Sequence, residues 1–388
     1  MRILHTSDWH LGRSFHRVDM LGHQAAYLDH LLSVVAEEQV DLVVVAGDVY
    51  DRALPPVDAV RLASETFARL ASSPARVVVS SGNHDSAHRL GFADDLIDAA
   101  GVHIRTRASR VGEPVLLEDR HGPVAVHALP YLDPDLVREP WGLTDRGHAA
   151  ALGEAMRRVR ADLSGRPSGT RSVVLAHAFV SGTTPVQVSD SERDISVGGV
   201  SRVPTSLFEG IDYTALGHLH GRHTLTETIR YSGSPLAYSF SETDHVKGSW
   251  LVDLGPGGLT SATFIPAPVP RPLARISGNL ADLLLAPEHE PQEACWLQVT
   301  LTDAVRPLRA MDQLRERFPH VLQLGFAPHS GGPQLPVAQP AAGRSDHAIA
   351  LDFVAEVRGS AATDAEAALL LDACDSCQPD RDLDREVG

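Results

Sequence analysis

Short apolar runs that each end in a polar side chain recur through the first part of the sequence, and this pattern constrains the fold most. The run 41–48 (DLVVVAGD) and the run 77–79 (VVV), which precedes SSGNHD, are two examples. Residues 20–38 and about 56–70 place apolar side chains at the three- and four-residue spacing of a helix face. Strand, helix and strand in succession predict an α/β fold (α+β in some schemes), with helices packed on a sheet.

The same pattern, an apolar run that ends in a polar residue, continues further along the chain. Additional strands are predicted at 2–6, 172–178, 213–220, 229–240 and 249–255. Several of these runs lead directly into Asp or His, as in HTSDWH at the first strand and ALGHLH after the strand at 213. Because sites in open α/β sheets form beyond the carboxyl ends of the strands, we expect these polar side chains to meet there.

The candidate site residues are the polar side chains that follow the predicted strands. They are Asp8, His10, Asp48, Asn83, His84, His177, His218 and His220. Mixed His, Asp and amide donors suit Mn²⁺, Fe²⁺ or Zn²⁺. The spacings D-x-H and H-x-H put two side chains on one side of a strand, so one member of each pair can reach a common ion. Asp48 could bridge two ions, and two ions about 3.5–4 Å apart stabilise a phosphoryl displacement.

Simpler interpretations exist for each motif taken alone. Gly82 and Asn83 suit a tight turn, and Asp85 suits a helix cap. The sequence has 20 histidines, and His5 and His127 lie inside predicted strands, where a core role is expected. The ordered occurrence of every motif after an apolar strand favours a metal site. The sequence contains neither G-x-S-x-G nor G-x-x-x-x-G-K-[ST], which argues against a serine hydrolase and a P-loop ATPase.

Length and composition indicate more than one domain. At 388 residues we expect two, and the run IPAPVPRP marks a stiff connector between them. A predicted strand at 294–303 and a helix and strand over 307–328 form a small α+β domain, and a last helical pattern runs over about 347–377. The predicted division is 1–265 for the site domain, 266–272 for the connector, 273–329 with about 347–360 for the small capping domain, 330–346 for a flexible linker, and 361–388 for a C-terminal helix and tail.

Charge and cysteine content exclude some classes of protein. A net charge of −16 argues against broad basic surfaces, yet bound cations could still bring nucleic acid to a site. Three cysteines do not make a disulfide framework. The start MRILHTSDWH lacks an apolar signal region, and no apolar run approaches the ~18 residues needed to span a bilayer. We therefore expect a cytoplasmic protein with no membrane contact.

Together the motifs resemble the calcineurin-like metallophosphoesterase superfamily, whose pattern is D-x-H, G-D, G-N-H-[DE], H and G-H-x-H. The finer resemblance is to the nuclease subunits of bacterial double-strand-break repair complexes. It rests on the stretches 6–13, 46–56, 81–90, 191–204, 212–221 and 231–242. The resemblance implies a β-sandwich flanked by helices, and residues 273–358 resemble the family's capping domain more loosely.

The resemblance also implies roles for individual residues. Two Mn²⁺ ions are expected, with Mg²⁺, Fe²⁺ or Zn²⁺ as alternatives. The first ion would be held by Asp8, His10, Asp48 and His220, and the second by Asp48, Asn83, His177 and His218. His84 would protonate or steady the leaving oxygen, and Asp85 would orient His84. Arg13 and Arg89 are candidate phosphate contacts, although a surface salt bridge explains each of them as well.

The implied activity is cleavage of DNA ends and hairpins, at the nucleoid, by a homodimer within a heterotetramer that contains an SMC-like ATPase. The apolar residues Ile349, Leu351, Phe353 and Val354 would dock on the ATPase coiled coil, or else complete the capping domain. Two other functions stay open at this point. One is a small-molecule phosphodiesterase or phosphatase of the same superfamily, and the other is a non-catalytic adaptor of the ATPase.

Overall fold

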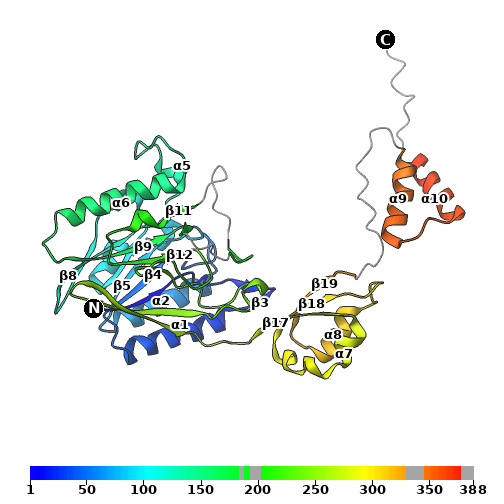
Figure 1. Ribbon diagram of the computed structural model, residues 1–388, viewed down its shortest axis with the longest axis horizontal. Helices are drawn as coiled ribbons and strands as arrows, with labels where there is room; N and C mark the ends of the chain where they lie inside the picture. Colours follow the sequence, from blue (N-terminus) through cyan, green and yellow to red (C-terminus); the bar gives the residue numbers. More distant parts are fainter. Residues whose placement is uncertain (183–187, 193–201, 329–344, 377–388) are drawn as a thin grey trace, which may run out of the picture. The chain divides into compact units, whose positions relative to one another are not determined.

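Two six-stranded sheets face each other, and helices cover their outer faces (Figure 1). The computed structural model describes residues 1–182, 188–192, 202–328 and 345–376. The chain divides into two compact units, one of Met1–Leu301 with Pro307–Phe326 and the other of Thr302–Arg306 with Ala327–Gly388. The layered sheets and helices confirm the predicted α/β class.

The first sheet is parallel from β1 to its β6 edge and antiparallel on the other side. Strands β1, β4, β5 and β6 run parallel, while β15 and β16 continue the sheet antiparallel beside β1. Helices α1 (Leu21–Glu37) and α2 (Val57–Ala71) pack on its outer face. The strand order is β16 (Gly258–Pro266), β15 (Gly248–Gly255), β1 (Arg2–Thr6), β4 (Leu42–Ala46), β5 (Arg76–Ser80) and β6 (Val102–Arg105).

The second sheet has parallel inner strands and antiparallel edges. Strands β8, β9, β12 and β14 are parallel, and β7 and β13 close the two sides. Helix α6 (His148–Ser164) covers its outer face. The strand order is β13 (His223–Thr224), β14 (Ile229–Tyr231), β12 (Tyr213–Gly217), β9 (Arg171–His177), β8 (Gly122–Ala128) and β7 (Val115–Asp119).

Alternate side chains of each central strand enter different cores. In β4, Leu42 and Val44 lie between the two sheets, whereas Val43 and Val45 pack under α1 and α2. Because both faces of the strand are covered, the run is apolar throughout rather than alternating with polar residues. The continuous apolar runs of the sequence therefore correspond to central strands of a sandwich, and their ends reach one common edge.

The capping region is a three-stranded parallel sheet with two helices packed on it (Figure 1). Its strands are β17 (Leu273–Gly278), β18 (Trp296–Leu301) and β19 (Val321–Phe326), and its helices are α7 (Leu280–Leu285) and α8 (Ala310–Arg317). Trp296, at the start of β18, packs with Phe15, Tyr238 and Phe240 of the site domain. The predicted strand 229–240 is therefore wrong beyond Tyr231, because its second part leaves the sheet to form this contact.

The last part of the described chain is a pair of helices, α9 (Asp346–Arg358) and α10 (Asp364–Ser376). A single helical run over about 347–377 is wrong, because Gly359 ends α9 in the left-handed conformation, with φ 72°. Helix α9 groups with α10 in the second compact unit, whereas residues 347–360 were predicted to complete the capping domain. The domain borders stay a prediction, and most of the 330–346 linker lies outside the described residues.

Shorter elements connect the main ones. They are β2 (Ser14–Phe15), β3 (Val18–Asp19), α3 (Ala87–Leu90), α4 (Asp94–Ile97), α5 (Pro134–Val137), β10 (Val180–Ser181) and β11 (Val203–Pro204). Among the helices of the described ranges, none is both long enough and apolar enough to cross a membrane.

Candidate metal centre

The predicted site residues meet at one edge of the sandwich. They lie at the carboxyl ends of β1, β4 and β5 in the first sheet and of β9 and β12 in the second. Three overlapping groups have candidate ligand atoms within 4.8 Å of one another: Asp8, His10 and His220; His10, Asp48 and His84; and Asp8, Asp48 and His177. The fold therefore brings side chains from the ends of separate strands together in one cluster.

The backbone turns sharply where these side chains leave the strands. Asp8, His10, Asp48 and His218 all have positive φ, between 46° and 106°. Residues other than glycine rarely adopt this region, and such conformations gather at functional sites. Hydrogen bonds hold the turns, since Asp8 N–H donates to the Gly47 carbonyl at 3.1 Å and His10 N–H donates to the Asp48 carbonyl at 3.0 Å.

The glycines of the G-D and G-N-H-D motifs leave room for the ligands beside them. A Cβ atom on Gly47 would lie 2.1 Å from His177 Nδ1, and a Cβ atom on Gly82 would lie 2.1 Å from Asp48 Oδ1. Both positions would overlap ligand side chains, so the close packing of the cluster requires glycine at each.

Distances between donor atoms fit shared ions. His10 Nε2 lies 3.0 Å from His220 Nε2, and His177 Nε2 lies 2.8 Å from Asn83 Oδ1 and 3.3 Å from Asp48 Oδ2. Two ligands that each lie about 2.1 Å from one ion at a right angle are about 3 Å apart. The donor pairs are therefore spaced as ligands of common cations would be.

The protonation pattern of His177 also fits a cation. Its Nδ1 atom lies 3.1 Å from the Ala46 carbonyl oxygen, to which it must donate its proton. The Nε2 atom of a neutral ring would then direct a lone pair at the oxygens of Asn83 and Asp48, which is unfavourable unless a positive charge lies among them. Burial opposes protonation, but the Asp48 carboxylate raises the pKa of His177 to about 9, so that a proton on Nε2 supplies this positive charge wherever a metal cation does not.

Burial dominates the charge balance of the other ligands. It lowers the pKa of His10 and His218 well below the ordinary value, and that of His220 to about 4. These rings are therefore neutral at pH 7, the form that binds metal. Burial also raises the pKa of Asp8 to about 7, and the nearby Asp48 carboxylate adds to this effect. Divalent cations would offset the cost of two buried carboxylates at this site.

His218 is the ligand that the geometry places least closely. It belongs to none of the three groups, although its ring centroid is 5.3 Å from that of His177. Its backbone N–H donates to the Asp8 carboxylate at 3.0 Å, which ties the turn after β12 to the turn after β1. The assignment of the seven ligands stays a prediction.

His84 lies beside the cluster and is only partly buried. Its backbone N–H donates to Asp48 Oδ1 at 2.8 Å, its ring Nδ1 atom is 2.7 Å from the Asp51 carbonyl oxygen, and its ring centroid is 4.8 Å from that of His10. The bond to the carbonyl places the proton of a neutral ring on Nδ1, which leaves Nε2 with its lone pair. The ring is thus held by a backbone carbonyl of the loop after β4.

Asp85 does not orient the His84 ring, and this part of the prediction is corrected. The Asp85 carboxylate accepts hydrogen bonds from three backbone N–H groups, those of Gly82, Val49 and Tyr50, at 2.9–3.1 Å. It therefore joins the loop after β5 to the loop after β4. Burial raises the pKa of Asp85 to about 7, with the Asp48 charge adding to the shift.

The two candidate phosphate contacts differ in their surroundings. Arg13 donates from Nη2 to the Ser191 carbonyl at 2.7 Å and stacks over the Tyr238 ring, with its guanidinium carbon 5.1 Å from the ring centroid. Arg89 is exposed and donates to the Ala53 carbonyl at 3.2 Å. Arg89 is therefore freer to move toward a phosphate than Arg13.

The prediction missed several residues that support the ligands. Gln24 donates from Nε2 to the His10 carbonyl at 2.8 Å, and the Asp51 carboxylate lies 3.8 Å from His10 Nδ1. Ser191 and Glu242 lie behind His220. Ser191 and Glu242 belong to stretches that carry the family resemblance, but a single sequence does not show which ligand such residues face.

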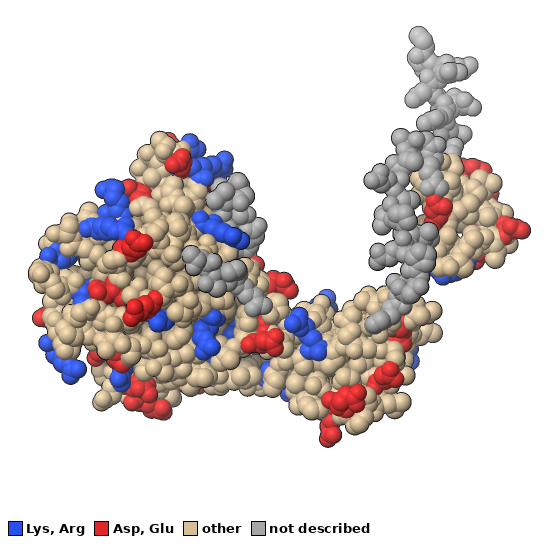
Figure 2. Space-filling view, in the orientation of Figure 1, with Lys and Arg blue, Asp and Glu red and all other residues tan. Residues whose placement is uncertain are grey.

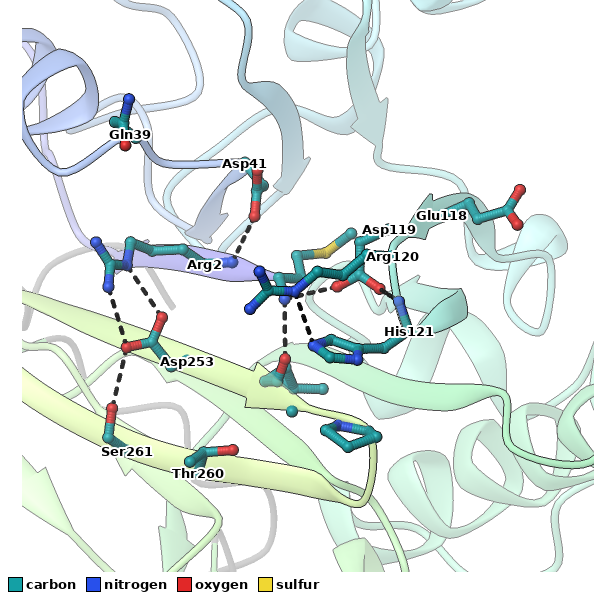
Figure 3. A pocket seen from close by; sticks show the side chains of 14 residues that line it. Arg2, Gln39, Asp41, Glu118, Asp119, Arg120, His121, Asp253, Thr260 and Ser261 are labelled. Carbon is teal, nitrogen blue, oxygen red and sulfur yellow. Dashed lines mark hydrogen bonds and ion pairs between the residues drawn. The ribbon is translucent and has the colours of Figure 1, made fainter.

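Two pockets differ in their relation to this centre. One of about 630 Å³ is lined by Asn83, Asp85, His88 and Tyr131, and so borders the cluster. The other, of about 900 Å³, lies at the amino ends of β1 and β4 (Figure 3). There Arg2 pairs with Asp253 at 3.0 Å, as the dashed lines show. Because that pocket lies at the strand ends opposite the ligands, it is not the candidate site.

The fold and the centre are those of a metal-dependent phosphoesterase, and comparison with known proteins agrees. The chain belongs to the calcineurin-like phosphoesterase family, whose model matches residues 1–222. A second model, the type 5 capsule protein repressor C-terminal domain (SbcD_C), matches residues 269–348. The chain is therefore a hydrolase of phosphoester bonds.

Among curated proteins, the chain is similar to the D subunit of the nuclease SbcCD from Staphylococcus epidermidis. The two are 29% identical over 327 residues, which cover 84% of this chain and 85% of that protein. This similarity confirms the predicted resemblance to the nuclease subunits of bacterial double-strand-break repair complexes.

Solved structures show more distant likenesses. TT1561 of Thermus thermophilus is 12% identical, with a TM-score of 0.40, over 68% of this chain and 98% of that one. GAP50, the anchor in the inner membrane complex of Plasmodium, is 11% identical, with a TM-score of 0.41, over 86% of this chain and 98% of that one. Likenesses at these scores carry no argument about function.

Proposed function

We propose that this chain is the Mn²⁺-dependent DNA nuclease subunit of an SbcCD-type complex. It would act as an ATP-dependent double-strand exonuclease and a single-strand and hairpin endonuclease in DNA repair, recombination and replication, at the nucleoid. The observation that carries the proposal is the buried cluster of His and Asp side chains at five strand ends, in a chain similar to an SbcCD nuclease subunit over most of its length.

Each part of the centre has a task in phosphodiester hydrolysis. Two divalent ions, held by the seven predicted ligands, would supply Lewis acidity toward the phosphate and lower the pKa of a coordinated water. His84 would direct Nε2 toward the leaving oxygen and hold or donate a proton there, because the Asp51 carbonyl fixes its Nδ1. Asp85 would keep the His84 loop in place through the three backbone N–H groups that it binds.

Surface charge favours a division of labour in binding DNA. Figure 2 shows basic and acidic side chains interspersed over the visible face, without a broad region of one sign. Together with the net charge of −16, this argues that the chain alone supplies few phosphate contacts. The SbcC-type, SMC-like ATPase would therefore provide much of the grip on DNA, and ATP would control access to the centre.

Two exposed apolar regions fit the expected partners. Phe353, Val357 and Leu369 on α9 and α10 are 64–71% exposed, and large exposed apolar side chains that cluster mark interaction surfaces. We place the docking of the ATPase coiled coil here. Leu54, Phe92 and Leu96 are 69–80% exposed on the segments that follow β4 and β5, and we place the contact between the two copies of a homodimer there.

Cleavage of an end-labelled DNA hairpin by the purified chain, with Mn²⁺ and then with the ATPase added, tests the proposal. The small diester bis(p-nitrophenyl) phosphate is the parallel substrate. Mn²⁺-dependent cutting of the hairpin, alone or with the ATPase, is expected. Turnover of the small diester with DNA left intact even when the ATPase is present would instead indicate a small-molecule phosphodiesterase.

A further inference from the structure

A buried ion pair lies directly behind the candidate ligand His220. Glu242 and Lys247 are both buried, and Glu242 Oε2 lies 2.5 Å from Lys247 Nζ. Lys247 is the only lysine in a sequence with 34 basic residues, so a chain that otherwise uses arginine has an ammonium at this point. Burying a pair of charges is costly unless its remaining hydrogen-bonding groups are also satisfied.

The ammonium group of Lys247 uses all three of its donors. Besides Glu242, it donates to Ser234 Oγ at 3.0 Å and to the backbone carbonyl of His220 at 2.8 Å. These three acceptors surround one point, which suits a compact ammonium and not the planar fork of a guanidinium. The ion pair therefore holds the backbone of His220 as well as facing its side chain.

Ser191 connects Glu242 to the His220 ring. A carboxylate can only accept, so the short hydrogen bond between Ser191 Oγ and Glu242 Oε1 uses the single proton of the serine. Ser191 Oγ must then accept from His220 Nδ1, which lies 2.6 Å away. The proton of the neutral His220 ring is thus on Nδ1, and Nε2 directs a lone pair into the cluster, where it faces His10 Nε2.

Two other ligand rings, those of His177 and His10, have weaker support. His177 donates from Nδ1 to a neutral backbone carbonyl, that of Ala46. His10 Nδ1 has no hydrogen-bond partner in the described part of the chain, and the Asp51 carboxylate lies 3.8 Å from it, beyond hydrogen-bond distance. A carboxylate behind a ligating imidazole fixes the tautomer of the ring and makes it a stronger metal ligand. Of the three rings, His220 is therefore the best supported.

We infer that Ser191, Glu242 and Lys247 are positioning residues that orient His220 and thereby set the affinity of the first metal position separately from the second. The inference deepens the proposed function, on which it rests, because it names what controls one half of the two-metal centre. These residues act through hydrogen bonds to one ligand. The Mn²⁺ affinity of the second metal position, which contains His177 and Asn83, should therefore be unaffected.

Ser191→Ala tests the inference, and Ser189→Ala is its matched control. Ser189 Oγ also donates to Glu242 Oε1, at 2.6 Å, but its hydrogen bonds go to Ser191, Ser241 and Glu242 and not to His220. Equilibrium dialysis of the full chain against Mn²⁺ measures both positions. Ser191→Ala should weaken one of the two positions by about tenfold to a hundredfold and leave the other unchanged. Ser189→Ala should change neither position to that degree.

Equal Mn²⁺ affinities in Ser191→Ala and Ser189→Ala would overturn the inference. It would also be overturned if Ser191→Ala lost Mn²⁺ affinity equally at both metal positions while keeping the melting temperature of the wild type. Glu242→Gln is the second variant and should weaken the same position as Ser191→Ala. If it unfolds because Lys247 loses its partner, Ser191→Ala decides alone. Wild-type chain that binds two Mn²⁺ but cuts no DNA would contradict only the proposed nuclease, whereas wild-type chain that binds none would contradict both.

Discussion

At the scale of single residues, the centre is assembled by backbone conformations that most side chains avoid. Asp8, His10, Asp48 and His218 have positive φ, and Gly47 and Gly82 leave room that a methyl group would fill. The sequence motifs predicted these positions because each follows an apolar strand. The role of Asp85 could not be predicted, because its carboxylate binds N–H groups on the loop after β4, which only the fold brings close.

Replacing His84 separates catalysis from metal binding. Because His84 faces the centre without being one of the predicted ligands, His84→Ala should keep two Mn²⁺ per chain and lower kcat for the small diester by about 10²–10⁴-fold. His121→Ala, in the turn between β7 and β8 and in the pocket at the strand ends opposite the ligands, is the control and should behave as wild type. Unchanged turnover in His84→Ala would contradict its role at the leaving oxygen.

Replacing Gly82 tests the packing of the centre. The added Cβ atom of Gly82→Ala would lie 2.1 Å from Asp48 Oδ1, so Asp48 must move. We expect weaker Mn²⁺ binding in dialysis and a loss of about 1–3 kcal/mol of unfolding free energy from overpacking. Gly22→Ala, whose Cβ atom meets nothing within 4 Å on helix α1, is the control. Wild-type Mn²⁺ affinity in Gly82→Ala would contradict the described geometry.

At the scale of elements, apolar runs predicted the central strands well, while helix ends and partners were harder to predict. The sequence predicted one helical pattern over 347–377, because leucine and alanine occur on both sides of Gly359. In the structure, Gly359 in the left-handed conformation separates α9 from α10. Several large apolar side chains of the two helices are exposed, and Phe353 alone is 64% exposed. Periodicity identifies such a helix without showing what covers it.

A charge on α9 tests the docking proposal. Phe353→Asp should weaken binding of the SbcC-type ATPase by at least about tenfold, as for a buried aromatic anchor, and leave turnover of the small diester unchanged. Leu308→Asp, at a position 87% exposed in the capping region, should bind the ATPase normally. Titration calorimetry or biolayer interferometry measures both variants. Equal ATPase affinity of Phe353→Asp and wild type would remove α9 from the interface.

At the scale of the whole molecule, the two facing sheets bring together motifs that are more than two hundred residues apart. Apolar periodicity predicted most of the strands and the class of fold, but not that β9 and β12 belong to a second sheet opposite β4. Strand pairing depends on contacts between distant segments, and a local pattern carries no information on them. The position of the polar residues at strand ends predicted that they meet, and the family resemblance implied a sandwich, but which strands form each sheet is seen only in the structure.

Away from the centre, an ion pair between a buried arginine and a partly buried aspartate lies at the opposite end of the second sheet. Arg171 of β9 binds Asp119 of β7, with Nη2 2.5 Å from Oδ1, and holds the pKa of Asp119 well below its ordinary value. Asp119→Asn should lower the unfolding free energy at pH 7 by about 1.5–3 kcal/mol, because the buried guanidinium of Arg171 loses its charged partner and keeps only backbone carbonyls as acceptors.

The effect of Asp119→Asn should depend on pH. A lowered pKa in the folded state stabilises the protein above the ordinary carboxyl value and loses that contribution as the pH falls through the lower folded value. The difference in unfolding free energy from wild type should therefore be full at pH 7 and narrow below about pH 4. Denaturant unfolding at several pH values measures it, and a difference that does not vary with pH would contradict the ionic role of Asp119.

The central claim is a two-metal centre at the strand ends, and anomalous diffraction from a crystal of the chain grown with Mn²⁺ tests it most directly. We predict two anomalous peaks on either side of Asp48, one bordered by Asp8, His10 and His220 and the other by Asn83, His177 and His218. A single peak, or peaks only outside this cluster, would contradict the account.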